Sequence, residues 1–543
     1  MIPALFLALP QEPEPPVENT PIDVGQVARA GRVIGLAFTD EELELMLGGV
    51  VEHLRAYETL QALPLANAVA PALVFDPLLG GPVPEVWLPA THELPLPGVA
   101  RPADLAELYF ADLATLAALV KTRQVSCTEL AELTLDRLET LDGELHFLIT
   151  PLRVRALDRA AELDAELEAG KWRGPLHGIP WGAKDLLAAR GGPTTWGAAP
   201  FRDQVIDADA WVVRRLDQAG ANLVAKLTLG ALAWGDVWFG GKTRNPWNPE
   251  QGSSGSSAGP ASAVAAGAVP FAIGSETLGS IVSPADRCGT SALRPTFGRV
   301  GREGAMALAW SMDKLGPLCR SVRDAALVLD AIQGVDPGDA ATVAAPWAAP
   351  VGPLAPDAVK GWKVGYDARA FEAALELAHV LDELRALGVE LVPFALPDFP
   401  VREMVLILDA ESATAFDELT RDGRDDQLVR QIEHAWPNRF RLSRLIPAVE
   451  YLRANRLRTQ LMVALREAMT GLDLVVHPSF DDAMLTATNL TGHPTVVAPA
   501  GFREDGTPFS ISFTGHLFDE ARLLTAARAW QESTSWHHRH PDL

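Results

Sequence analysis

The feature that most constrains the fold is a long run of small and apolar residues in the middle of the chain. Residues 251–267 are QGSSGSSAGPASAVAAG, and AVPFAIG follows up to residue 274. A serine-rich segment can be a flexible linker, but this one passes directly into an alanine-rich stretch that favours a helix. Pro260 and Pro270 argue against a membrane-spanning helix. The run therefore predicts a tight loop, a buried helix and then a buried strand.

The chain around this run alternates helical and strand-like segments. Amphipathic spacing predicts long helices over 111–140 and 153–169. The short apolar runs 221–226 and 268–274 predict buried strands. This alternation is typical of α/β proteins. The predicted fold class is therefore α/β, with a β-sheet sandwiched between α-helices.

The second half of the chain continues the alternation. Apolar runs predict strands within 359–367, 388–394 and 472–480. Residues 401–470 have a mostly helical pattern, and a final helix is expected around 518–532. We therefore expect one large domain over 103–543 that contains a helical insertion.

The N-terminal part has a different pattern. Residues 1–22 begin with apolar residues that no basic region precedes, and continue rich in Pro and Glu. They predict a disordered lead-in or the remnant of a signal segment. Within 23–102, Thr39 and Glu42 have the spacing of a helix-capping box, and Pro-rich segments follow. This region predicts an N-terminal helical extension joined to the domain by an irregular strap.

Composition excludes several classes of function. The chain has 543 residues and a formal net charge of −24, so it would be repelled by the phosphates of a nucleic acid. Its three cysteines are scattered and form no CxxC pair. Such a set is neither a disulfide framework nor a zinc motif. We therefore expect buried free cysteines, and neither a metal nor another cofactor.

Three segments have residues suited to chemistry. In GIPWGAKDLL, Lys184 lies among apolar residues, where burial would lower its pKa and make it a usable base; a lysine that extends to the surface is the alternative. The serine run forms either an active loop or a structural one, and it lacks the P-loop motif. In GSETLGSIVSPADRCG, Ser280 follows a predicted strand in a loop whose backbone N–H groups could form an oxyanion hole.

Together, in this order and spacing, the three segments resemble the amidase signature family, whose enzymes use a Ser-cisSer-Lys triad. The resemblance covers roughly residues 105–540 and extends to TRNPWNPEQGSSGSSAGPASAVAAG, CGTSALRPTFGRV and SMDKLGPLCRSV. It implies the amidase-signature fold, in which a large mixed β-sheet is sandwiched between α-helices, and a catalytic domain over 103–543. It also implies a serine amidohydrolase that cleaves carboxamide bonds through an acyl-enzyme.

Two Gly-Ser-Ser triplets compete for the position of the middle serine. Counting back without gaps from residues 264–267 places the family's triplet on 255–257, and counting forward from 247–249 gives the same result. Choosing 252–254 instead requires a three-residue gap. The resemblance therefore implies that Ser256 is the middle serine, entered through a cis peptide bond from Gly255.

The resemblance also implies the roles of the site residues. Ser280 would be the nucleophile, Ser256 the relay and Lys184 the base. Ser257 and Gly255 would support the triad. The backbone N–H groups expected to form the oxyanion hole are those of Thr277, Leu278, Gly279 and Ser280.

The loop departs from the family pattern at several positions. The common Asp-Thr-Gly-Gly-Ser is Glu276-Thr277-Leu278-Gly279-Ser280 here, and Val282 stands where Arg is frequent. Leu278 lacks a glycine's backbone freedom at an expected oxyanion position. Asp185, next to the lysine, is expected to be structural. Four tryptophans near the motifs are candidates for substrate binding, with core packing as the alternative: Trp181, Trp234, Trp238 and Trp310.

The N-terminal extension leaves a second function open. Residues 23–75 are similar to the small helical subunit that accompanies the amidase subunit of tRNA-dependent amidotransferase, although an arm that packs on the domain or on a twin chain explains the same pattern. The alternatives are therefore a glutamine-hydrolysing amidotransferase subunit or a non-catalytic amidase-fold binding protein. The expected partners are a small-molecule amide and a second copy in a homodimer, with no nucleic acid bound directly and no membrane. We expect a cytoplasmic protein, or an exported one if residues 1–10 are the remnant of a signal peptide.

Overall fold

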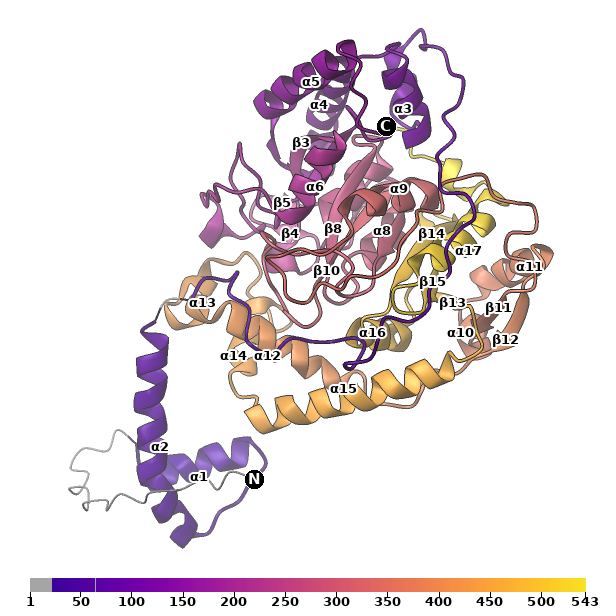
Figure 1. Ribbon diagram of the computed structural model, residues 1–543. Coiled ribbons are helices and arrows are strands. Elements are labelled where there is room, and N and C mark those ends of the chain that lie inside the picture. The colour runs from indigo at the N-terminus through magenta and orange to yellow at the C-terminus, as the bar shows by residue number, and fades with distance from the viewer. Residues whose placement is uncertain (1–21, 64) are drawn as a thin grey trace, which may run out of the picture.

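An 11-stranded mixed sheet forms the centre of the computed structural model, which describes residues 22–63 and 65–543. Helices flank this sheet (Figure 1), so the predicted α/β class is confirmed. The strand order is β1-β3-β2-β8-β10-β9-β14-β15-β13-β11-β12. In chain order the strands are β1 (Leu148–Pro151), β2 (Pro180–Lys184), β3 (Asn222–Leu227), β8 (Phe271–Glu276), β9 (Ser291–Arg294), β10 (Lys314–Cys319), β11 (Lys363–Tyr366), β12 (Glu390–Pro393), β13 (Leu474–Pro478), β14 (Thr495–Phe502) and β15 (Pro508–Gly515).

Two short hairpins lie outside the large sheet. They pair β4 (Val237–Trp238) with β5 (Gly241–Lys242), and β6 (Arg244–Asn245) with β7 (Asn248–Gly252). The helices of the main body are α3 (Leu113–Lys121), α4 (Cys127–Leu145), α5 (Arg153–Glu168), α6 (Trp211–Ala219), α7 (Ala258–Ala265), α8 (Val282–Cys288), α9 (Val322–Ile332), α10 (Ala368–Ala373), α11 (Ala378–Ala386), α12 (Leu406–Ala415), α13 (Asp417–Arg421), α14 (Trp436–Ser443), α15 (Ala448–Ala468), α16 (Asp482–Thr491) and α17 (Glu520–Glu532).

The prediction of one helix over 111–140 is wrong, because two helices occupy this stretch. α3 ends at Lys121, and Arg123 then adopts a left-handed backbone conformation with φ of 55°. Ser126 begins α4 through a capping box with Glu129. The Ser-x-x-Glu spacing was present in the sequence, but the continuous apolar pattern masked the break.

The alanine-rich part of the small-residue run forms α7, which is packed inside the protein. Every residue of α7 is buried. An added Cβ at Gly259 would lie 2.4 Å from Thr228 N and 2.6 Å from Phe147 O, so the helix lies directly against neighbouring backbone. The helix is short and fully covered by protein. None of the helices within the described ranges is both long enough and apolar enough to cross a bilayer.

The N-terminal extension begins with two helices that project from the main body (Figure 1). They are α1 (Val24–Val33) and α2 (Asp40–Gln61), and Thr39 caps α2 together with Glu42. An irregular segment then runs over the main body, where Trp87 packs edge-on against Trp362. The boundaries 23–102 and 103–543 remain predictions. The predicted lead-in, apart from residue 22, lies outside the described residues.

The close approach at Gly259 generates a stability prediction. Gly259→Ala should lower the free energy of unfolding by about 1–3 kcal/mol, because the new methyl group collides with backbone that cannot move aside. Urea denaturation of both proteins measures the change. Gly48→Ala in α2 is the matched control, since open space surrounds Gly48. It should be neutral or stabilising by up to about 1 kcal/mol, and equal losses in the two variants would contradict the packing argument.

Candidate active site

Lys184 ends β2, an interior strand between β3 and β8, and has no exposed surface. Its ammonium group faces hydroxyl groups: Nζ lies 2.8 Å from Ser256 Oγ, 3.1 Å from Ser257 Oγ and 2.8 Å from Ser275 Oγ. Burial lowers the pKa of Lys184 well below its usual value, and the charges of Asp313 and Glu276 offset this only in part. The lysine is therefore poised to lose its proton and accept one from a neighbouring hydroxyl.

The serine loop connects β7 to α7 and places its serines differently. The peptide bond between Gly255 and Ser256 is cis. Ser257 Oγ donates to Ser275 O at 3.1 Å and accepts from Ser275 N at 3.2 Å, which clamps the loop onto β8. Ser253 is not a hydrogen-bond partner of Lys184, and its hydroxyl instead donates to Ser254 O at 2.9 Å.

Ser280 lies in the loop between β8 and α8 and is partly buried. Its carbonyl oxygen accepts a hydrogen bond from Ser257 N at 3.0 Å, so the backbone joins the two serine-bearing loops. Between the described residues Ser256 and Ser280 no hydroxyl–hydroxyl hydrogen bond is formed. Catalytic hydrogen bonds often become short only when substrate is bound.

The backbone of this loop leaves several donors free. Within the described chain, no protein acceptor receives the N–H groups of residues 277–280. Gly279 supplies the left-handed turn, with φ of 80°, whereas Leu278 has no positive φ. The substitution of leucine for glycine is therefore compatible with the turn. Val282 is buried in an apolar cluster with Ala261 and Ala285.

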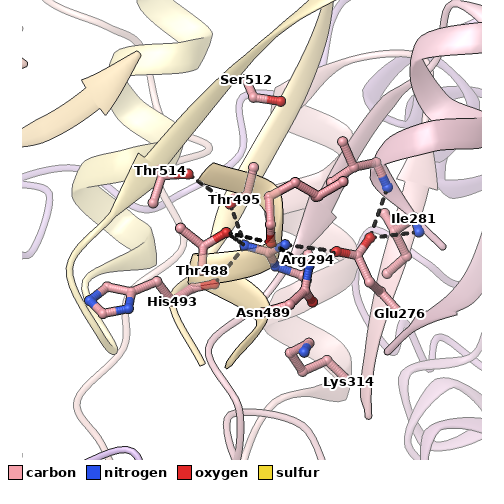
Figure 2. A network of polar contacts seen from close by, with 12 residues as sticks. Glu276, Ile281, Arg294, Lys314, Thr488, Asn489, His493, Thr495, Ser512 and Thr514 are labelled. Atoms are coloured by element: carbon pink, nitrogen blue, oxygen red, sulfur yellow. Dashed lines mark hydrogen bonds and ion pairs between the residues drawn. The ribbon is translucent and has the colours of Figure 1, made fainter. Parts of the chain in front are cut away.

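Glu276 holds the loop in this shape from the end of β8 (Figure 2). Its Oε2 accepts hydrogen bonds from Ile281 N at 2.7 Å and Val282 N at 2.9 Å. Its Oε1 accepts from Arg294 Nη1 at 2.7 Å and from Asn489 Nδ2 at 2.8 Å. Glu276 therefore accepts hydrogen bonds from the two N–H groups that follow Ser280. It does not accept from the N–H groups of the described residues 277–280.

Arg294 connects this carboxylate to distant parts of the chain. Its Nη2 donates to Thr488 Oγ1 at 2.9 Å, His493 O at 3.0 Å and Thr495 Oγ1 at 2.6 Å (Figure 2). Burial alone would raise the pKa of Glu276, but the charges of Arg294 and Lys314 and the hydrogen bonds outweigh it and hold this pKa at about 2. Glu276 is therefore ionised over the physiological range.

Asp313 is a second carboxylate at this site. Its Oδ1 accepts from Thr277 Oγ1 at 2.5 Å, and its Oδ2 accepts from Leu308 N at 2.8 Å and Ala309 N at 3.0 Å. Sequence reasoning missed Asp313, Ser275 and Arg294 and assigned Glu276 no role. The segment SMDKLGP was part of the resemblance and contained Asp313, but its spacing alone did not indicate a contact with Thr277.

Asp185, next to the base, has structural partners. Its Oδ2 accepts hydrogen bonds from Thr195 N at 2.8 Å and Thr195 Oγ1 at 2.5 Å. Its Oδ1 forms an ion pair with Lys226 Nζ at 2.5 Å, and neither side chain is exposed. These contacts fix the chain just after β2.

The four tryptophans lie in different places. Trp181 is fully buried and stacks on Phe271 at 6.0 Å, so its prediction as a pocket residue is wrong. It lies three residues before Lys184 on one strand, and such side chains point to opposite faces. Trp238 is nearly buried against Phe239, and Trp234 packs edge-on against Trp436.

Trp310 is the candidate that reaches the site. It lines a cavity of about 110 Å³ that Ser275, Thr277 and Asp313 also line. The other walls are mostly apolar and include Leu186 and Leu308. The cavity can therefore receive an apolar group beside the loop that carries Ser280. In the described part of the chain, no cluster of three or more His, Cys, Asp or Glu side chains could hold a metal ion.

Comparison with known proteins identifies the family. The model of the protein family described as Amidase matches residues 129–486, more than half of the chain. The chain belongs to the amidase family. It is 32% identical over 485 residues to the A subunit of glutamyl-tRNA(Gln) amidotransferase from Moorella thermoacetica, a match that covers 80% of this chain and 99% of the relative. It is 33% identical over 472 residues to the corresponding protein of Thermosynechococcus vestitus, covering 78% and 97%.

Solved structures of amidases share the fold. The peptide amidase of Stenotrophomonas maltophilia superposes with a TM-score of 0.70 at 30% identity, covering 81% of this chain and 99% of that one. A bacterial aryl acylamidase of the amidase signature family gives a TM-score of 0.71 at 23% identity, covering 80% and 98%, and this likeness shows the fold alone. The resemblance inferred from the motifs is thereby confirmed at the level of the family.

The Glu276–Arg294 pair generates a second prediction. Arg294→Met should lower the free energy of unfolding by about 3–5 kcal/mol near pH 7, because it leaves a buried carboxylate without its partner. Arg385→Met is the matched control: the pair of Arg385 with Asp382 is 51% and 81% exposed, so its loss should cost less than about 1 kcal/mol.

The pH dependence of unfolding separates this effect from lost packing. Because the pKa of Glu276 is about 2 in the folded protein and ordinarily 4.5, its ionisation stabilises the fold fully above about pH 4.5. That contribution disappears as the pH falls from 4.5 toward 2. Urea unfolding of Arg294→Met should lose this part of the pH dependence, and an unchanged acid profile would contradict the assigned pairing.

Proposed function

We propose that the protein is a serine amidohydrolase that cleaves carboxamide bonds through an acyl-enzyme on Ser280. The observation that carries this proposal is the fully buried Lys184, whose Nζ lies 2.8 Å from Ser256 Oγ. A lysine with a lowered pKa beside a serine is a base for hydroxyl activation. Membership of the amidase family supports the same chemistry.

The proposed reaction moves one proton through the serines. Neutral Lys184 accepts the proton of Ser256, and Ser256 accepts that of Ser280 as Ser280 Oγ attacks the amide carbonyl carbon. The free N–H groups of residues 277–280 stabilise the negative oxygen. The C–N bond breaks, and the proton returns through Ser256 to the leaving amine. Water then attacks the acyl-enzyme by the same relay, releasing the acid and restoring Ser280.

The relatives favour a second candidate function. The amidotransferase relatives match this chain over nearly their whole length, which supports glutamine hydrolysis within a tRNA-dependent amidotransferase. This candidate requires a partner chain and a pocket for glutamine. It predicts little hydrolysis of aryl amides by the isolated protein and a gain of glutaminase activity with a partner. A homodimer and a purely binding role remain untested predictions.

Serine variants test the nucleophile and the choice of triplet. Ser280→Ala and Ser256→Ala should each lower kcat for an aryl amide by about 10³-fold or more, because the covalent step and the relay are lost. Ser253→Ala is the matched control and should stay within about threefold of wild type. Thermal unfolding should show all three variants folded. A silent Ser256→Ala with a severe Ser253→Ala would refute the relay.

The pH profile tests the base. Because the lysine must be neutral to accept a proton, kcat/KM should rise with pH through the pKa of Lys184 and level off well below the usual 10.5. Lys184→Arg, which stays protonated, should lose activity at every pH. Lys171→Met at the exposed Lys171 should leave the profile unchanged. A rate that climbs steadily to pH 10.5 would exclude a lysine with a lowered pKa.

A further inference from the structure

The strap that follows α2, defined here as residues 65–74, crosses the surface beside the candidate active site. Ala68 and Ala70 line the same cavity as Ser275, Thr277 and Trp310. Both alanines are nevertheless exposed to solvent. The strap therefore forms an outer wall of this cavity, between the reacting loop and solvent.

Asn67 anchors the strap near its start. Its Nδ2 donates to Ala307 O at 2.9 Å, and its Oδ1 accepts from Ala307 N at 2.7 Å. A weaker contact joins Nδ2 to Ala415 O at 3.5 Å. The side-chain amide thus pairs with one backbone peptide group as a neighbouring strand would, and this fixes the strap over residues 305–308.

Phe75 anchors the other end. Its ring packs edge-on against Phe297 with centroids 5.0 Å apart, and the guanidinium of Arg458 lies 3.6 Å from the ring centroid. Pro77 and Leu78 beyond it are buried. The residues between the two anchors are exposed, with Leu73 at 72%. The strap is therefore held at both ends and spans the cavity between them.

A larger cavity of about 790 Å³ adjoins this one and is lined in part by strap residues 65–68. Its walls include the aromatic residues Trp196, Phe201 and Phe416 and also several charged residues, among them Arg421 and Arg424. The residues that line both cavities are Ala68, Gly304, Ala305 and Met306. The wall between the two spaces is therefore thin, and the strap supplies only a methyl group to it.

We infer that the strap determines substrate specificity: Ala68 and Ala70 admit amides that carry an extended apolar group, which passes beneath the strap from the reacting loop toward the larger cavity. This inference rests on the proposed function, because it assigns the substrate class of the same site. Ala68 contributes only a methyl group to the thin wall between the two cavities, and the aromatic residues of the larger cavity offer contacts to an aryl or long alkyl group.

The first test narrows the passage from the strap side. Ala68→Trp should lower kcat/KM for a long-chain fatty acyl amide or aryl anilide by about tenfold or more, mainly through KM, because the indole occupies the space of the apolar group. Hydrolysis of acetamide should change less than about twofold. Ala72→Trp is the matched control, since Ala72 is exposed on the same strap and lines neither cavity. Equal behaviour of the two variants toward both amides would overturn the inference.

A second test does not depend on turnover. Cys127, Cys288 and Cys319 are buried, so a thiol introduced by Ala305→Cys becomes the target for a maleimide. Adding Asn67→Ala should release the strap and speed its modification about tenfold or more. The same reagent on Val154→Cys, at a position 76% exposed, should show no such gain. Equal rates with and without Asn67→Ala would show that the strap does not cover the cavity.

The two tests separate failure of the inference from failure of the proposed function. If the wild type hydrolyses no amide, the proposed function fails, while the labelling rates still report whether the strap covers the cavity. If amides are hydrolysed but Ala68→Trp matches Ala72→Trp, the proposed function stands and the inference alone is wrong.

Discussion

The buried ion pair between Glu276 and Arg294 is the interaction on which the candidate site depends most. It joins the end of β8 to β9, α16 and β14, and it supplies the acceptor for the N–H groups after Ser280. A buried charge pair costs much desolvation, which is repaid only when further hydrogen bonds satisfy both partners. Here those hydrogen bonds also give the loop its shape, so the stability of the domain and the arrangement of backbone donors have a common cause.

Lys184 is also buried, but its hydrogen-bond partners differ from those of Arg294. No exposed surface remains on it, and its nitrogen faces the hydroxyl groups of Ser256 and Ser275, with the carbonyl oxygen of Ser275 3.3 Å away. Hydroxyls can donate or accept, so they accommodate both protonation states of the amine, whereas a carboxylate would hold it charged. Lys226, on the neighbouring strand β3, is equally buried but is ion-paired with Asp185. The difference between these two lysines lies in their partners.

The fold class and the family could be predicted because they depend on local features. The small-residue run predicted the buried α7, and the ordered motifs led to the amidase family. The break between α3 and α4 was missed because a continuous apolar face outweighed one capping signal. Pairwise partners far apart in the chain were not predictable: Asn489 lies 213 residues from Glu276, and no local pattern links them. Trp181 shows the same limit, since nearness in sequence to Lys184 did not place it on the same face of β2.

The strap is continuous with the domain that it covers. A segment tethered in this way remains at high effective concentration near its binding surface, however dilute the protein becomes. A wall contributed by a separate chain would instead dissociate on dilution, and the cavity would then lose its shape. By carrying this wall covalently, the chain keeps the geometry of its cavity independent of the abundance of any other protein.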